Sequence, residues 1–441
     1  MKNKTKLWLI FGPVICAVLL LMGILSLPWE RTFSKGSLFQ AAASQTTTVF
    51  KGKAMRQKAY KQGYVPFYGS SELSRFDNMH PTVLATKYHR SYTPFLLGGP
   101  GSQSLAQYLG MQEAPSKKAV VIISPQWFTP QGQNPDAFTL YYSPLHASDF
   151  ILNAKDTEAD RYAARRLLQM PSVKSEHVIH HALLEIAAGV GISKMERYYL
   201  RWRRQIYSTE DKFFTSLQLR DRLPKIEQQG AKLPDTYSYE GLKKASEKEA
   251  KKDTKGNRFG IRTSFYKKRL NAKLLKKLKG SQKKFNYVES PEYSDFELLL
   301  NQFAKDKTQV LFIIPPVNAK WQKYTGLSQK MYDTATTKIK HQLISQGFDN
   351  IYDLSKDGKK KYFMEDTIHL GWNGWLAVDQ AVKPFMEQKY AEPEYAINDY
   401  YLTKTWREKK KLPTVALTNK DVLAKLKKIS FRGEKIVRKP V

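Results

Sequence analysis

A long apolar run near its start constrains this chain more than any other feature. Residues 7–27 are 21 consecutive residues without a charged side chain. An α-helix of that length, rising about 1.5 Å per residue, covers the roughly 30 Å core of a bilayer. A secretory signal has a shorter apolar region of about 7–15 residues, with a small-residue cleavage site close behind it. The nearest candidate site, at residues 41–43, lies too far downstream. We therefore expect a retained anchor rather than a cleaved signal or a buried core helix.

Lysines on one side of this run predict its orientation. Lys2, Lys4 and Lys6 precede the run, and the positive-inside rule places such an end in the cytoplasm. The chain is thus expected to cross the cell membrane once, with everything after Pro28 outside the cytoplasm.

Short apolar runs alternate with helical segments in the rest of the chain. Continuous runs of this kind are typical of strands buried on both faces of a parallel sheet. Strands alternating with helices predict an α/β fold, a three-layer α/β/α domain. The strands are expected at residues 65–68, near 95–97, and at 119–124, 308–314 and 350–354. Clear helices are expected at residues 158–170, 174–188, 331–346 and 372–390.

The charge balance predicts an anionic partner. The chain has 73 Lys and Arg against 40 Asp and Glu, a formal net charge of +33. Residues 241–285 hold 17 basic and 3 acidic side chains, and residues 404–441 hold 13 and 3. A solvated charged face accounts for solubility but not for the excess of one sign, which suits a phosphate-rich polymer or anionic lipid. Nucleic acid suits the charge equally, but the expected location and the lack of a recognised nucleic-acid motif argue against it.

The sequence gives little support for a metal site or a disulfide bond. Cys16 is the single cysteine, which excludes an internal disulfide and a zinc site built from cysteines. His177 and His181 are four residues apart and share a face of a predicted helix, but no glutamate is placed as in the HExxH zinc motif. A surface or packing role is favoured for both histidines, and we expect no metal and no cofactor.

Two distant segments carry the parts of a nucleophilic triad. Gly69-Ser70-Ser71 follows the first predicted strand, and we expect Gly69 to permit unusual backbone dihedrals in a tight turn. Ser71 would then present its hydroxyl at the end of a strand, where open α/β sheets place their chemistry. Far downstream, Asp366 and His369 are three residues apart. Each segment alone is also compatible with an ordinary turn or a local hydrogen bond, but together they match a Ser-His-Asp constellation.

In this order, the two segments resemble the SGNH or GDSL-type hydrolase family. The block 69–73 is similar to the Gly-Asp-Ser-Leu block of that family, with Ser70 in place of the aspartate. The resemblance is closer to those members that attach D-alanine to lipoteichoic acid, and it covers nearly the whole chain. It implies that Ser71 is the nucleophile, His369 the general base and Asp366 its orienting carboxylate.

The resemblance also suggests donors for an oxyanion hole. In the family a glycine from the block after the second strand donates its N–H, which implies Gly101 here, with Gly99 as the next choice; a plain loop capping a helix at Ser102 is the alternative. The family usually supplies an asparagine after the third strand. This chain has Gln126 instead, whose amide offers the same donor on a longer stem.

The function implied is acyl transfer of D-alanine to lipoteichoic acid through a Ser71 acyl-enzyme. The partners implied are the polymer itself, a membrane O-acyltransferase and a D-alanyl carrier protein. Two alternatives stay open: an esterase or thioesterase that hydrolyses D-alanyl esters or the carrier thioester with the same triad, and a non-catalytic module that binds the acceptor for the O-acyltransferase.

The expected domain organisation follows from these features. An approach segment at 28–60 is polar, and Lys51, Lys53 and Arg56 within it could lie on anionic headgroups. The segments are a cytoplasmic N-terminus at 1–6, a transmembrane anchor at 7–27, the approach segment, an SGNH-like domain at 61–395 with a basic helical insertion at about 145–290, and a basic extension at 396–441.

Overall fold

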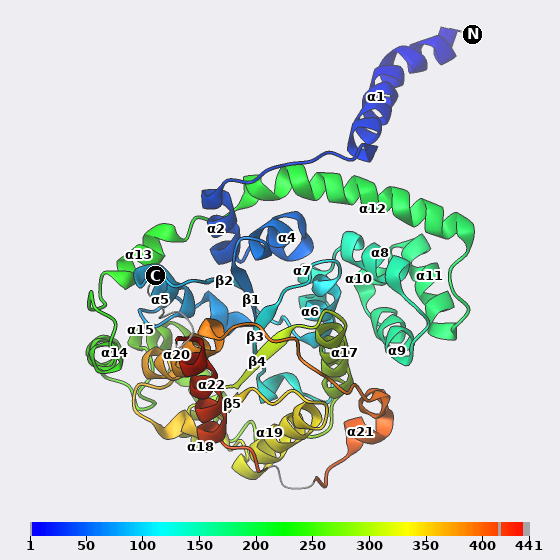
Figure 1. Ribbon diagram of the computed structural model, residues 1–441. Helices are drawn as coiled ribbons and strands as arrows, with labels where there is room; N and C mark the ends of the chain where they lie inside the picture. Colours follow the sequence, from blue (N-terminus) through cyan, green and yellow to red (C-terminus); the bar gives the residue numbers. More distant parts are fainter. Residues whose placement is uncertain (1, 413–415, 435–441) are drawn as a thin grey trace, which may run out of the picture.

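A five-stranded sheet forms the centre of the molecule. The computed structural model describes residues 2–412 and 416–434. All neighbouring strands are parallel, in the order β2-β1-β3-β4-β5 (Figure 1). This confirms the predicted α/β fold. The strands are β1 Tyr64–Tyr68, β2 Thr93–Leu97, β3 Lys118–Ile122, β4 Gln309–Ile314 and β5 Ile351–Asp353.

Side chains of one strand alternate between two hydrophobic cores, which makes the domain three-layered. Val121 of β3 belongs to one core, whereas Val120 and Ile122 belong to the other. This alternation is the period-2 geometry of a strand buried on both faces. The first core contains residues of α6 Ser104–Met111, α17 Glu292–Lys305 and α19 Gln329–Ile344. The second contains residues of α5 Pro81–Lys87, α20 Trp372–Glu387 and α22 Asn419–Glu434.

Helices and the loops between them make up the connection between β3 and β4. Its long helix α12 lies across the end of the molecule from which α1 projects (Figure 1). The described residues between these two strands contain no further strand. Before α17, its α-helices are α7 Pro135–Tyr141, α8 Pro144–Asn153, α9 Glu158–Leu167, α10 Pro171–Lys174, α11 His177–Ala188, α12 Lys194–Phe214, α13 Leu223–Gly230, α14 Tyr239–Asp253, α15 Thr263–Arg269 and α16 Ala272–Leu278.

The N-terminal helix α1, Lys2–Ser26, projects from the domain (Figure 1). Its segment Trp8–Ser26 has a mean hydropathy of 2.6 and is long enough to cross a membrane. Few of its residues are covered by protein, which distinguishes it from a core helix.

Residues 35–60 pack into the domain more closely than a polar approach segment suggests. They form α2 Lys35–Ser44, α3 Thr47–Lys51 and α4 Ala54–Tyr60, and many of their alanines and larger apolar residues are buried. The expectation that Lys53 and Arg56 lie on headgroups is wrong. Lys53 is buried and pairs with Asp149, and Arg56 donates to the Gly110 carbonyl at 2.7 Å. Their partners are distant in sequence, so the local pattern gave no sign of them.

The C-terminal segment also packs on the domain within its described part. Trp406 of α21, Lys404–Glu408, is fully buried and donates from Nε1 to Gln342 Oε1 at 2.9 Å. Helix α22 packs on α20 and β5, burying Val422 and Leu426. Residues 413–415 and 435–441 of the predicted basic extension lie outside the described residues.

Candidate active site

The predicted nucleophile turn follows β1 directly. Ser71 opens the short 3-10 helix Ser71–Ser74 and is half-buried. The Glu72 carboxylate accepts a hydrogen bond from the Ser70 N–H at 2.6 Å, which fixes the turn. We expected Gly69 to permit unusual backbone dihedrals, but the structure gives it a different reason, which is space. Its φ is not positive, but a Cβ at this position would lie 2.5 Å from Glu72 Oε1.

The tertiary structure brings Ser71, His369 and Asp366 into one hydrogen-bonded chain. Ser71 Oγ lies 2.7 Å from His369 Nε2. His369 Nδ1 lies 2.8 Å from Asp366 Oδ2 and 2.9 Å from Oδ1. Since an ionised carboxylate only accepts hydrogen bonds, Nδ1 carries the proton and Nε2 is left to accept from the serine hydroxyl. These are the relations that a nucleophile, a general base and its orienting carboxylate require.

Asp366 is held ionised by its surroundings. Burial opposes its charge, but the interactions with His369, the Arg75 guanidinium and the Ile368 N–H lower the pKa of this carboxyl to about 2. Oδ1 accepts from the Ile368 and His369 N–H groups, both at 3.0 Å. Arg75 Nη2 lies 3.1 Å from Oδ2. Asp366 is therefore a charged group at neutral pH, in the position where a charge can stabilise an imidazolium.

A tight hairpin presents this pair. Met364 and Leu370 form an antiparallel bridge, and the Glu365 N–H donates to the His369 carbonyl at 2.9 Å. Gly371 closes the hairpin, where a Cβ would lie 2.6 Å from the Glu365 nitrogen. The loop thus folds back on itself and aims Asp366 and His369 in one direction, toward the end of β1.

Sequence reasoning missed a cluster of charges behind the triad. Arg262 Nε lies 3.0 Å from Glu365 Oε1, and Arg75 Nη1 lies 3.7 Å from the same oxygen. Burial raises the pKa of Glu365, and the two arginines oppose that shift. Arg262 comes from the basic insertion, so the insertion contacts the loop that carries Asp366 and His369. No local signal could have revealed this, because the contact joins segments that are far apart in the chain.

Of the two glycines proposed as oxyanion donors, Gly99 is hydrogen-bonded to the nucleophile turn, whereas Gly101 is not joined to Ser71. Gly101 has a left-handed backbone (φ 77°), and a Cβ there would lie 2.5 Å from the Ala137 Cβ. Its carbonyl accepts from Gln133, and none of the hydrogen bonds among the described residues joins it to Ser71. Gly99 is tied to the nucleophile turn, since Ser70 Oγ donates to its carbonyl at 3.1 Å. The helix that follows, α6, begins at Ser104 with Gln103 as N-cap, rather than being capped by Ser102.

Gln126 lies in the short 3-10 helix Pro125–Trp127 after β3. Its backbone N–H is 3.4 Å from Ser124 Oγ, and none of the hydrogen bonds among the described residues involves its side-chain amide. Its role as an oxyanion donor stays a prediction.

The basic insertion exposes a compact group of lysines. Leu275 of α16 is buried, and Leu274 and Leu278 pack against the core, so the helix has the apolar face that the sequence predicted. The lysines on its other side are exposed and form no ion pair among the described residues. We call them the lysine patch: Lys273, Lys276, Lys277 and Lys279.

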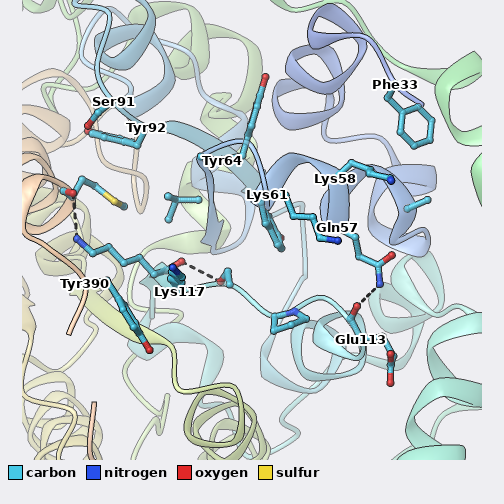
Figure 2. A pocket seen from close by; sticks show the side chains of 18 of the residues that line it. Phe33, Gln57, Lys58, Lys61, Tyr64, Ser91, Tyr92, Glu113, Lys117 and Tyr390 are labelled. Carbon is cyan, nitrogen blue, oxygen red and sulfur yellow. Dashed lines mark hydrogen bonds between the residues drawn. The ribbon is translucent and has the colours of Figure 1, made fainter. Parts of the chain in front are cut away.

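A large cavity lies at the amino ends of the strands, at the opposite end of β1 from Ser71. It measures about 960 Å³ and is lined by residues at the amino ends of β1, β2 and β3, among them Tyr64, Tyr92 and Lys117 (Figure 2). Ser71 follows the carboxyl end of β1, so this cavity is separate from the triad. Arg31 and Lys212 also line it, which places it beside the segment that follows α1.

One exposed cluster has the composition of a metal site. His181, Glu185 and Glu196 have ligand atoms within 4.8 Å of one another. Glu196 is already used as the partner in a capping box with Ser193 at the start of α12, and its carboxylate faces His181 Nδ1 at 2.6 Å. His177 is not part of the cluster. His181 therefore contacts the residue that caps the start of α12.

Comparisons with known proteins agree on one family. A family model described as DltD protein matches residues 42–387. The chain is 44% identical to Protein DltD of Lacticaseibacillus rhamnosus over 409 residues, or 91% of this chain and 96% of that protein. It is 32% identical to Protein DltD of Bacillus subtilis (strain 168) over 401 residues, 85% and 96% of the two chains. It is 29% identical to Protein DltD of Staphylococcus aureus (strain NCTC 8325 / PS 47) over 353 residues, 78% and 86%.

Proposed function

Since this chain belongs to the DltD protein family, we propose that it is a membrane-anchored serine acyltransferase that esterifies lipoteichoic acid with D-alanine outside the cell membrane. The observation that carries the proposal is the hydrogen-bonded chain from Ser71 Oγ through His369 to Asp366. The family connects the chain to D-alanylation, and the triad supplies the chemistry.

In the first step the enzyme takes the acyl group from its donor. As Ser71 Oγ attacks the carbonyl carbon of the D-alanyl group, His369 Nε2 accepts the hydroxyl proton and Asp366 stabilises the imidazolium. The bond between the carbonyl carbon and the donor's thiol or alcohol then breaks. His369 returns the proton to that leaving group, and a D-alanyl ester remains on Ser71.

In the second step the acceptor takes the acyl group. A hydroxyl of the polymer attacks the Ser71 ester, and His369 accepts the hydroxyl proton. The bond to Ser71 Oγ breaks and His369 returns the proton to the serine, so the enzyme is restored. Water in place of the polymer hydroxyl would give hydrolysis by the same route.

Backbone N–H groups stabilise the oxyanion formed in both steps. The candidates are the N–H groups of Ser71, Gly99 and Gly101, of which Gly99 is linked to Ser70; the side-chain amide of Gln126 is a further, sequence-based choice. One such donor is typically worth about 3–4 kcal/mol in transition-state free energy.

The charge distribution supports an anionic acceptor. The lysine patch is exposed on the same insertion that contributes Arg262 to the surroundings of the triad. A polymer of glycerol phosphates would be attracted to such a surface. The proposed partners are a membrane O-acyltransferase and the D-alanyl carrier protein, which would deliver the acyl group, and α1 would hold the domain at the outer face of the membrane.

The experiment is mass spectrometry of the Ser71 peptide after incubation with the membrane D-alanylation system from which lipoteichoic acid has been left out. We expect a D-alanyl adduct on Ser71, and its loss when lipoteichoic acid is added. Ser74 is the matched control, because it lies in the same 3-10 helix and its hydroxyl donates to the Ser71 carbonyl rather than to His369. An adduct that persists in Ser71→Ala, or a system that transfers D-alanine normally with that variant, contradicts the proposal. Release of free D-alanine without polymer ester would indicate an esterase.

A further inference from the structure

Helix α12 has an inner side fastened to the domain. Leu200 is fully buried, Arg203 Nη2 lies 2.8 Å from Glu176 Oε2, and Arg204 pairs with Asp149. Nearer its end, Asp211 Oδ2 accepts from the N–H groups of Lys53 and Ala54. These contacts join one side of a helix of 21 residues to α8 and α4, so the helix is a rigid edge of the domain.

Residues in a stripe on the opposite side of α12 form hydrogen bonds with the end of α1 and the residues that follow it. Trp202 Nε1 donates to Ser26 Oγ at 3.1 Å. The side chains of Gln205 and Thr209 donate to the Leu27 carbonyl at 3.0 and 3.2 Å. Lys212 Nζ donates to the Trp29 carbonyl at 2.8 Å. Residues 202, 205, 209 and 212 follow the spacing of three and four that marks one face of a helix.

The same stripe continues toward the start of α12, where the other described residues leave its side chains largely exposed. Met195 is 76% exposed and Tyr198 is 72% exposed, and both keep the spacing of the stripe back from Trp202. The Tyr199 ring lies 6.0 Å from the Trp202 ring. Lys194 and Arg201 are exposed along this side. The result is a line of large apolar and aromatic side chains with basic residues beside it.

The contacts between α12 and the end of α1 indicate which environment the exposed side chains of α12 face. Trp8–Ser26 is the segment long and apolar enough to cross a bilayer, so Ser26 lies where the span ends. Because Ser26 and Leu27 are hydrogen-bonded to α12, the stripe is held at the level of the headgroups. Tyr, Trp, Lys and Arg are the residues that membrane interfaces favour, and a helix with an apolar line and a basic border is typical of those that lie in the interface plane.

We propose that α12 is an interfacial helix whose outer stripe, from Met195 to Lys212, lies among the headgroups of an anionic bilayer. A helix of 21 residues spans about 30 Å at 1.5 Å per residue, so α1 and α12 together would fix the orientation of the domain and not only its distance from the membrane (Figure 1). Lipid is the occupant because the stripe continues from the end of the membrane span and the exposed charges along this side, Lys194 and Arg201, are basic.

The test uses the full chain in nanodiscs that contain phosphatidylglycerol. Cys16 is the single cysteine, so Cys16→Ser followed by Tyr198→Cys gives one site for a nitroxide label. The collision rates of the label with oxygen, which enriches in lipid, and with a water-soluble nickel chelate are measured by electron paramagnetic resonance. Tyr239→Cys is the matched control, an exposed tyrosine on α14 away from this stripe.

We expect the ratio of oxygen to nickel collisions to be higher at 198 than at 239. Met195→Cys repeats the measurement one turn earlier and should agree, which keeps the test valid if one substitution disturbs folding. Equal ratios at all three positions would overturn the proposal. So would a label at 198 that is aqueous in lipid nanodiscs and becomes shielded only when a partner protein is added. The readout does not depend on acyl transfer, so failure here is distinct from failure of the proposed function.

Discussion

Asp366→Asn should inactivate the triad while leaving its shape nearly unchanged. In the wild type, Oδ1 accepts from two backbone N–H groups, those of Ile368 and His369. The amide oxygen of an asparagine would keep that position, because an NH₂ group there would face two donors. The NH₂ group would then replace Oδ2, opposite His369 Nδ1 and Arg75. Nδ1 would become an acceptor, Nε2 would carry the proton, and the imidazole could no longer accept from Ser71 Oγ.

The expected loss in activity is large and the loss in stability is moderate. The same change in a serine protease triad lowers kcat by about 10⁴, through the wrong tautomer, which corresponds to about 5.5 kcal/mol in activation free energy. The pKa of Asp366 is lowered from 3.8 to about 2, so its charge contributes about 2–3 kcal/mol to the free energy of unfolding. Because the folded-state pKa is depressed, this contribution is present above about pH 4 and is lost as the pH falls toward 2.

The assay is the rate at which a fluorophosphonate labels Ser71, combined with urea unfolding. The labelling rate should fall about 10⁴-fold in Asp366→Asn, and the stability difference from wild type should be present at pH 7 and shrink as the pH falls below 4. Asp349→Asn is the control, because Asp349 is exposed and pairs with Lys425 on the surface; it should change neither measurement by much. A labelling rate within tenfold of wild type would refute the tautomer argument.

Four further outcomes are expected. Ser71→Ala and His369→Ala should each abolish ester-linked D-alanine on the cell envelope, and the double variant should be no worse than either single one because a triad acts as a unit. Ser70→Ala should have a mild effect. Loss of ester-linked D-alanine in Ser70→Ala but not in Ser71→Ala would mean that Ser70 is the nucleophile. Arg75→Met should slow fluorophosphonate labelling about tenfold at most, because a partly exposed ion pair contributes little, and a loss as large as that of Asp366→Asn would show that Arg75 does more than support Asp366. Replacing all four residues of the lysine patch by glutamine should weaken retention on lipoteichoic acid at low salt and have less effect at high salt; equal retention at low salt would leave the patch a solubilising face. Protease added to intact protoplasts should digest the domain, whereas full protection would contradict the predicted topology.

The strands and the triad could be predicted because their signals are local. Each strand is a short apolar run, since a strand buried on both faces has no polar side to present. Asp366 and His369 are three residues apart, so the hairpin that joins them is formed by residues that are close together in the sequence. Ser71 follows a strand, and strand ends are where parallel sheets collect their reactive groups. These features required no knowledge of what lies far away in the chain.

The packing of charged residues could not be predicted in this way. The headgroup role expected for Lys53 failed because Asp149, its buried partner, lies in another helix. The sequence did not reveal that Arg75 and Arg262 contact the loop that carries Asp366 and His369. An arginine that pairs with a distant carboxylate cannot be told from an exposed one by its neighbours in the sequence. Gly69 was singled out for unusual backbone dihedrals, whereas the structure shows a close approach of Glu72 and no positive φ at this residue.

The sequence by itself indicated the parallel α/β fold and an apolar helix long enough to cross a membrane, because hydrophobic patterning specifies them, and it singled out Ser71, Asp366 and His369 as candidates through their local motifs. The tertiary structure alone decided that Ser71 Oγ and His369 Nε2 lie 2.7 Å apart, that the basic insertion contributes Arg262 behind the triad, and that the end of α1 is fastened to α12. Each of these is a contact between distant segments, and such contacts depend on how the whole chain packs rather than on any one stretch of it.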